Sequence, residues 1–309
     1  MPSKSLTELT AVEARDHMAK GDITAEAYVR ACLDAIEARE KEIEAWVVCD
    51  RDHALAQARA ADKQRASGQG VGALHGLPVG IKDIIDTADL PTQNGSPIFK
   101  GYQPAKDASC VAQIRAAGGI VMGKTVTTEL ANVNPNKTRN PHNPEHTPGG
   151  SSSGSAAAVG AKTVPLALGT QTGGSVIRPG SFCGVHALKP TLGLISRTGA
   201  TLQSHTLDTI GVYGRSLADL ALITDALGAH DPGDSVSYTR ARPNLSQALA
   251  GGAAVKPKLA FVKSPAWPEA DAAAKEALTA FLGKLGSVVE EVEIAEMADI
   301  IKHHANVMG

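Results

Sequence analysis

The feature that most constrains the fold is an alternation of short apolar runs with helix-forming segments. Runs rich in Val, Ile and Leu predict buried strands, and the segments between them predict helices. The strands are expected at 78–82, 118–124, 163–169, 258–262 and 287–294. Helices that alternate with short apolar strands imply a sheet covered on both faces. The sequence therefore predicts an α/β fold.

The N-terminal part of the chain is expected to be helical. Residues 5–46 contain three helix-capping signals, and an Ala-rich segment at 51–66 predicts a further helix. The capping signals are Ser5 with Glu8, Thr10 with Glu13, and Thr24.

Composition and charge exclude several classes of protein. The formal net charge is −2 and aromatic residues make up 3% of the chain, so nucleic-acid binding through a basic patch interleaved with aromatics is not expected. No run of 18 apolar residues predicts a membrane span, and the N-terminus lacks the apolar stretch of a signal peptide. The four cysteines form no CxxC pair and are expected to be reduced, as in a cytoplasmic protein.

Residues 149–179, GGSSSGSAAAVGAKTVPLALGTQTGGSVIRP, are rich in serine and glycine and contain no His, Asp or Glu. Within them, GTQTGGS follows an expected strand and precedes a short helix. Glycines leave successive backbone N–H groups unshielded, so this loop can hold an anion such as the oxyanion of an acyl transfer. The donors would be the N–H groups of Thr172, Gly173, Gly174 and Ser175. A glycine-rich turn without chemistry is the alternative.

Other interpretations of this segment fit less well. A phosphate-binding loop is disfavoured because the pattern GxxxxGK[ST] is absent, and the GxSxG pattern of a nucleophile elbow matches poorly around Ser175. The run SSSGS at 151–155 could be a flexible linker or a helix cap. The cap is the stronger of these two, because an Ala-rich helix is expected to follow directly.

A base for these serines has to come from elsewhere in the chain. Lys82 lies at the carboxyl end of an expected strand, in VGIKDII, where sites in open sheets tend to form. Burial would lower the pKa of this lysine and make it a usable general base. The alternative is a lysine that pairs with Asp83 or Asp86.

Four stretches together resemble the amidase signature family. They are GLPVGIKD around Lys82, GGSSSGSAAAV at 149–159, GTQTGGSVIRP at 169–179 and FCGVHALKPT at 182–191. Their order and spacing match that family, and the resemblance extends from about residue 5 to the end of the chain. Within the family, GIKDIIDTADLPT, NPHN, GGSSSGS and GTQTGGSVIRP are most similar to bacterial malonamidase.

The resemblance implies a single domain with a mixed, twisted β-sheet covered by helices on both faces. The last residues, EMADIIKHHANVMG, predict a helix that is cut off partway, so we expect this domain to be incomplete at its C-terminus. Within 1–309 we expect an N-terminal helical part at 1–70, a catalytic core at 71–230 and a peripheral α/β part at 231–309.

The resemblance also implies a triad of a serine, a cis-serine and a lysine. Ser175 corresponds to the nucleophile, Ser151 to a bridging serine held by a cis peptide bond after Gly150, and Lys82 to the base. The base that the serine-rich segment lacks is then a lysine that acts through a second serine.

Substrate contacts are expected through Thr170, Gln171 and Arg178. Gln171 stands where the common family loop GTDTGGSIRxP has Asp, and Arg178 lies three positions after Ser175 instead of two. Both features are found in malonamidase, in which that arginine binds the free carboxylate of the substrate. The resemblance therefore favours a small acidic amide. A structural arginine paired with a carboxylate is the alternative.

The chain is accordingly expected to be an amidase that cleaves the carbon–nitrogen bond of a small amide such as malonamate and releases ammonia. No metal and no cofactor are expected, no nucleic acid or membrane is an expected partner, and a homodimer is compatible with the resemblance. The alternatives are an amidase for another small amide, an allophanate-type hydrolase, the A subunit of the aminoacyl-tRNA amidotransferase, and a non-catalytic fragment.

Overall fold

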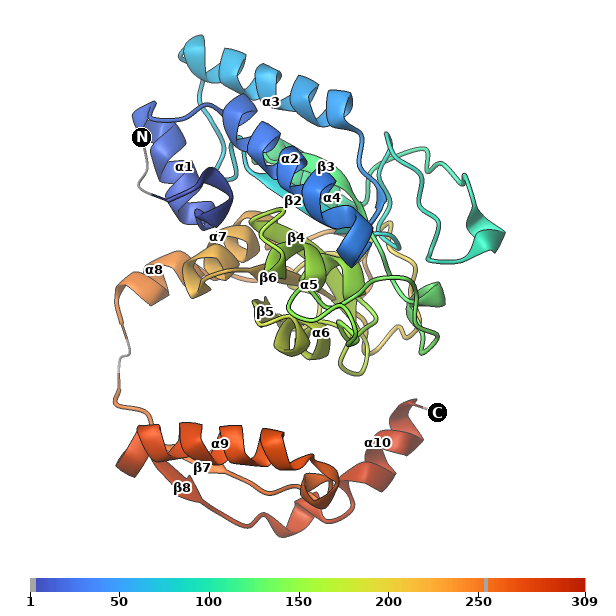
Figure 1. The fold of residues 1–309 in the computed structure, drawn as a ribbon, viewed down its shortest axis with the longest axis vertical. Coiled ribbons are helices and arrows are strands. Elements are labelled where there is room, and N and C mark those ends of the chain that lie inside the picture. The colour runs from blue at the N-terminus through green and yellow to red at the C-terminus, as the bar shows by residue number, and fades with distance from the viewer. Residues whose placement is uncertain (1–3, 253–254, 309) are drawn as a thin grey trace. The chain divides into compact units, whose positions relative to one another are not determined.

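A six-stranded sheet organises most of the chain in the computed structural model, which describes residues 4–252 and 255–308. Its spatial order is β1-β3-β2-β4-β6-β5 (Figure 1). The strands are β1 (Trp46–Val48), β2 (Pro78–Lys82), β3 (Ile120–Thr125), β4 (Leu166–Gln171), β5 (His186–Leu188) and β6 (Thr209–Gly214). This sheet belongs to the first of two compact units, Met1–Ala250 and Gly251–Gly309.

The sheet is mixed and covered on both faces. β2 runs parallel to β3 and to β4, whereas β1 is antiparallel to β3, and β6 is antiparallel to β4 and β5. Successive residues of a strand point to opposite faces, and every residue of β2, β3 and β6 is buried. Other parts of the chain therefore cover both faces, which confirms the expected α/β fold.

Three of the six strands lie where apolar runs predicted them, and three were missed. β1 and β5 have only three residues each. β6 reads TIGVYG, and glycine weakens a strand pattern because it has no side chain to pack. The tertiary structure requires the first of these glycines, since a Cβ on Gly211 would lie 2.7 Å from Val176 and 2.9 Å from the carbonyl oxygen of Leu188.

The N-terminal helices are α1 (Ala11–Lys20), α2 (Ala25–Ile43) and α3 (Arg51–Ala66). Thr10 and Glu13 form the expected capping box, and the Thr24 hydroxyl accepts a hydrogen bond from the N–H of Ala27. The prediction for Ser5 with Glu8 was wrong, because the Ser5 side chain makes no capping bond and only a single 3₁₀ turn follows it. The expected helical region also ran too far, since Trp46 begins β1.

The remaining helices of the first unit are α4 (Ser109–Ala116), α5 (Ser153–Gly160), α6 (Ile177–Phe182), α7 (Leu217–Leu227) and α8 (Leu245–Ala250). Helix α5 contacts β2, β3, β4 and β6. Helix α5 can pack closely against the sheet because it consists of serine, glycine and alanine with one valine. A Cβ on Gly154 would lie 2.3 Å from the carbonyl oxygen of Ala45 and 2.4 Å from the nitrogen of Val126. The small residues of SSSGSAAAV thus fix the distance between this helix and the sheet.

The second unit contains a two-stranded parallel sheet, β7 (Leu259–Phe261) and β8 (Val289–Glu291), joined through α9 (Ala272–Leu285) and followed by α10 (Ile300–Met308). The two strands lie within the segments expected at 258–262 and 287–294 but are shorter. The division of the chain at 70 and 230 stays a prediction.

Candidate active site

Lys82 is the last residue of β2 and is completely buried. In the parallel pairing of β2 with β3 it lies opposite Thr125, so the two side chains share a face of the sheet. The hydroxyl groups of Thr125 and Ser155 lie 2.6 Å apart, which identifies this face as the one that α5 covers. The fold therefore places Lys82 on the face of the sheet that helix α5 covers.

The Lys82 amine contacts two hydroxyl groups. Its Nζ lies 2.7 Å from Ser151 Oγ and 2.7 Å from Thr170 Oγ1, and the Thr170 carbonyl oxygen is 3.5 Å away. Burial holds the pKa of Lys82 well below its usual range, although the charge of Asp208 acts in the opposite direction. An amine in this setting favours its neutral form.

Ser151 lies in the turn that leads into α5. The peptide bond between Gly150 and Ser151 is cis, as the resemblance implied, and Ser151 is 3% exposed. Its carbonyl oxygen accepts a hydrogen bond from the N–H of Thr128 at 3.1 Å. The turn therefore rests against the segment that follows β3.

Ser152 was not singled out in the sequence and ties this turn to two other parts of the site. Its hydroxyl accepts a hydrogen bond from the N–H of Thr170 and donates one to the carbonyl oxygen of Thr170, both at 3.2 Å. Its backbone N–H donates to the carbonyl oxygen of Ser175 at 3.2 Å. Through Ser152, the chain holds Ser151 and Ser175 in adjacent segments.

Ser175 lies in the glycine loop between β4 and α6 and is partly exposed. Across 4–252 and 255–308, no hydrogen bond joins its side chain to that of Ser151. In the same ranges, the N–H groups of Thr172, Gly173, Gly174 and Ser175 donate no hydrogen bond within the chain. Four successive unpaired donors beside a serine can bind an oxyanion.

A buried aspartate that the sequence analysis missed braces this loop. Asp208 is 5% exposed, and its Oδ1 accepts a hydrogen bond from the Thr172 hydroxyl at 2.5 Å. Gln203 Oε1 lies 3.0 Å from the same hydroxyl oxygen. The second carboxylate oxygen accepts from the N–H groups of Gln203 and Ser204. Asp208 directly precedes β6, so the strand that the sequence did not predict positions this aspartate beside the loop.

The three residues expected to bind substrate are engaged to different degrees. The Thr170 hydroxyl contacts Lys82, and the side-chain oxygen of Gln171 accepts hydrogen bonds from the N–H groups of Val176 and Ile177 at 2.9 and 3.0 Å. Gln171 therefore caps the start of α6. Arg178 is exposed, and its Nε donates to the carbonyl oxygen of Gly150 at 3.1 Å. Contact between these three residues and a substrate stays a prediction.

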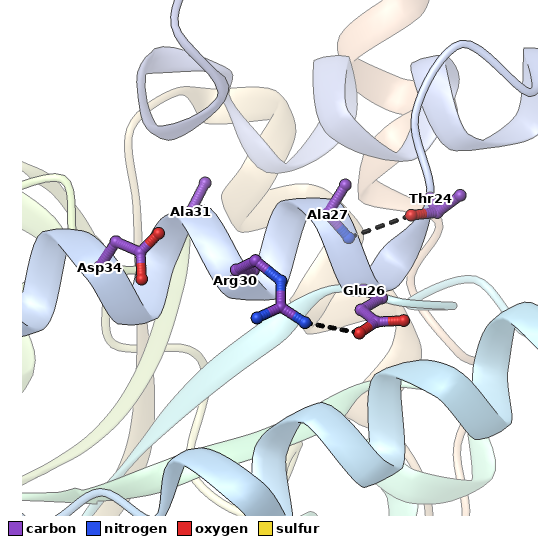
Figure 2. A pocket seen from close by; sticks show the side chains of 6 residues that line it. All are labelled: Thr24, Glu26, Ala27, Arg30, Ala31 and Asp34. Atoms are coloured by element: carbon purple, nitrogen blue, oxygen red, sulfur yellow. Dashed lines mark hydrogen bonds and ion pairs between the residues drawn. The ribbon is translucent and has the colours of Figure 1, made fainter.

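A surface pocket on α2 has no counterpart in this chemistry. Figure 2 shows that its side chains come from the first half of that helix and from Thr24 before it. Glu26 and Arg30 form an ion pair of 2.7 Å, and Thr24 caps the helix, so its polar groups have local partners. In the described parts of the chain, no group of three or more His, Cys, Asp and Glu residues is arranged to hold a metal ion. No helix there is long and apolar enough to cross a membrane.

Comparison with known proteins identifies relatives that cover most of this chain. The A subunit of glutamyl-tRNA(Gln) amidotransferase from Chloroflexus aurantiacus is 42% identical over 252 residues, which are 80% of this chain and 52% of that protein. The peptide amidase from Stenotrophomonas maltophilia aligns with a TM-score of 0.85 and 31% identity over 97% of this chain and 65% of that one. A solved structure from a vestigial protein complex linked to the origins of an s-triazine catabolic enzyme aligns with a TM-score of 0.89 and 31% identity, covering 97% and 67%.

The chain spans about half the length of the curated relatives it matches. These relatives do not support the expected similarity to malonamidase in particular. The profile described as Amidase matches residues 27–308. The chain therefore belongs to the amidase family.

Proposed function

We propose that this protein hydrolyses the carbon–nitrogen bond of an amide, with Ser175 as the nucleophile, Ser151 as a bridging acid–base and Lys82 as the base. The observation that carries the proposal is the buried Lys82 amine at 2.7 Å from the Ser151 hydroxyl, with its pKa lowered by burial. A neutral amine in that place can accept a proton. A serine with unpaired N–H groups on its own loop lies in the adjacent segment.

The proton path follows from the number of hydrogens on a neutral amine. Its two N–H bonds can point to the hydroxyl and carbonyl oxygens of Thr170, which leaves the nitrogen lone pair facing Ser151. Ser151 gives its proton to Lys82 as it takes the proton of Ser175, and the Ser175 oxygen bonds to the amide carbon. The N–H groups of residues 172–175 then stabilise the oxyanion.

Collapse of that intermediate breaks the carbon–nitrogen bond. The proton on Lys82 returns through Ser151 to the leaving nitrogen, which departs as ammonia from a primary amide and leaves an ester on Ser175. A water molecule gives up a proton along the same path and attacks the ester. The products are a carboxylic acid and the free Ser175 hydroxyl.

The substrate is the open part of the proposal. The similarity to the A subunit of glutamyl-tRNA(Gln) amidotransferase favours a second candidate, namely a component that hydrolyses an amide within an assembly that includes other proteins. The position of Arg178 supports a small acidic amide such as malonamate as the substrate. Its guanidinium lies against the loop that carries Ser175, since a Cβ on Gly174 would be 3.5 Å from its Nη2 atom. The cytoplasmic location and the homodimer stay predictions.

Release of ammonia from malonamate, propionamide and glutamine tests these alternatives. We expect Arg178→Ala to lower kcat/KM for malonamate by roughly 10- to 150-fold, because a charge-assisted contact contributes about 1.5–3 kcal/mol. The neutral propionamide should be affected little. Equal losses with both amides would make Arg178 structural. Glutamine turnover that needs a co-purifying protein would favour the amidotransferase role, and absence of ammonia release with every amide would contradict the proposal itself.

A further inference from the structure

A second lysine, Lys124, is as deeply buried as Lys82 but serves no purpose in the reaction as proposed. It lies in β3 directly before Thr125 and is 0% exposed. In the pairing of β2 with β3, Lys124 is opposite Ile81, whereas Lys82 is opposite Thr125. The two lysines therefore point to opposite faces of the sheet. Lys124 faces the segment that follows Lys82 in the chain.

The Lys124 amine binds that segment at several points. Its Nζ donates hydrogen bonds to the Thr92 hydroxyl at 2.6 Å and to the carbonyl oxygens of Ile85 at 2.8 Å and Pro91 at 3.3 Å. It also lies 3.5 Å from a carboxylate oxygen of Asp83, which is fully buried too. One amine thus joins both ends of the segment 83–92 to β3.

Asp83, the first residue of this segment, makes further hydrogen bonds that hold it in place. Its N–H donates to the carbonyl oxygen of Thr125 at 3.0 Å, and its carbonyl oxygen accepts from the N–H of Asn94 at 2.8 Å. Its carboxylate accepts from the N–H of Gln93 at 3.1 Å. The carbonyl oxygen of Lys82 itself accepts from two N–H groups, those of Ile84 and Ile85, at 2.8 and 2.9 Å. The backbone that carries the base is therefore anchored through its immediate successors.

We propose that Lys124 and Asp83 are positioning residues that hold the backbone of Lys82, so that its amine stays within reach of Ser151. This inference rests on the proposed function, in which Lys82 is the base. A buried ion pair is seldom the most stabilising choice for a core, because desolvation of both charges offsets their attraction. A lysine reaches four oxygen atoms on one loop at once, which an apolar side chain does not.

The electrostatics of the pair agree with this role. Burial lowers the pKa of Lys124 to about 8, while Asp83, Asp86 and Asp89 act to keep it charged. Burial raises the pKa of Asp83, and Lys124 opposes that shift. Each partner thus depends on the other for its charge, and removal of one alone would leave a buried charge unpaired. A test of positioning has to avoid that complication.

Two variants of the full natural polypeptide provide the test. Thr92→Val removes the shortest bond of Lys124 and leaves the ion pair intact. Asp83→Asn with Lys124→Met removes both charges together with the contacts of the amine. Lys162→Met is the matched control, because Lys162 is an exposed lysine paired with Glu8 at 3.0 Å.

We expect kcat to fall by roughly 100-fold in the double variant, because a displacement of a catalytic group by about 1 Å costs about that factor. Thr92→Val removes only one of the contacts, so we expect a smaller fall of kcat, roughly 10-fold. KM should change by less than about threefold, since the substrate contacts are untouched. The backbone amides of Ile84 and Ile85 should exchange hydrogen at least about 10-fold faster in both variants, while those of Ile210 and Val212 in β6 keep their rates. The control should match the parent in every measurement.

Parent-like kcat together with parent-like exchange at Ile84 and Ile85 in the double variant would overturn the proposal. A loss of protection that includes β6 in both variants would show that the pair stabilises the whole core, which also contradicts a positioning role. If the parent releases no ammonia, the proposed function fails, whereas the exchange rates still test whether the pair holds the backbone at Lys82.

Discussion

Replacement of Lys82 by methionine should abolish activity and at the same time change how stability depends on pH. Methionine has a similar length but no titratable group, so it removes the proposed base without leaving a large cavity. We expect ammonia release to fall by at least about 10³-fold, as for other groups that act as a unit with a nucleophile. Lys82→Arg should not restore it, because a guanidinium keeps its proton at these pH values.

The magnitude for stability follows from the environment of the amine. Burial holds the pKa of Lys82 well below its usual range in the folded protein. Below the unfolded value of about 10.4, the unfolded chain therefore binds a proton that the folded chain does not bind. The free energy of unfolding of the parent is highest above that pH and falls by about 1.4 kcal/mol per pH unit until the folded pKa is reached.

Lys82→Met lacks this contribution, so its stability relative to the parent should increase as the pH falls from 9, by about 1.4 kcal/mol per pH unit down to the folded pKa of Lys82. The loss of the bonds to Ser151 and Thr170 subtracts about 1 kcal/mol each and does not depend on pH. Lys124 titrates in both proteins and cancels. The change of the difference with pH is therefore the informative quantity.

Denaturant unfolding of both proteins at pH 7, 8 and 9 measures this difference, and ammonia release at the same pH values measures activity. Two parallel stability curves would refute the reasoning, because they would mean that Lys82 is protonated in the folded protein. A Lys82→Met variant that keeps the activity of the parent would exclude Lys82 as the base.

Three other predictions concern separate parts of the chain. Ser175→Ala should lower turnover by about 10⁴-fold or more and prevent labelling by a serine-directed acylating reagent; labelling that persists would identify another nucleophile. Gly154→Ala should reduce the free energy of unfolding by about 3 kcal/mol, because its Cβ would meet backbone atoms at 2.3–2.4 Å, whereas Gly70→Ala, with nothing within 4 Å, should change it by less than about 0.5 kcal/mol. Burial, aided by Arg65, lowers the pKa of His75, although Asp62 and the backbone of Ala61 act in the opposite direction. Stability that is present above the unfolded pKa of about 6.5 should be lost as the pH falls below it, and melting temperatures at pH 7.5 and 5.5 should differ less in His75→Leu.

Local patterns were sufficient for much of the fold. The apolar run at 78–82 predicted β2 with its bounds, and the capping residues Thr10 and Thr24 predicted where two helices begin. These signals act within a few residues, so no knowledge of the rest of the chain is needed to interpret them. The choice of Lys82, Ser151 and Ser175 as candidates came instead from the resemblance to the amidase signature family, carried by several motifs and their spacing along the chain. Their roles remain proposals.

What only the tertiary structure decided is how distant segments meet. Asp208 lies 36 residues after Thr172, and Lys124 lies in a different strand from the one that Asp83 follows, so no local pattern announced either contact. The side-chain oxygen of Gln171 caps the start of α6, a contact that only the fold reveals, and its expected contact with a substrate stays a prediction. β6 escaped prediction because its glycine is required by Val176 and Leu188, which approach it from other parts of the chain. A sequence pattern reports the preferences of a segment, whereas the pairing of buried polar groups depends on which segments the folded sheet brings together.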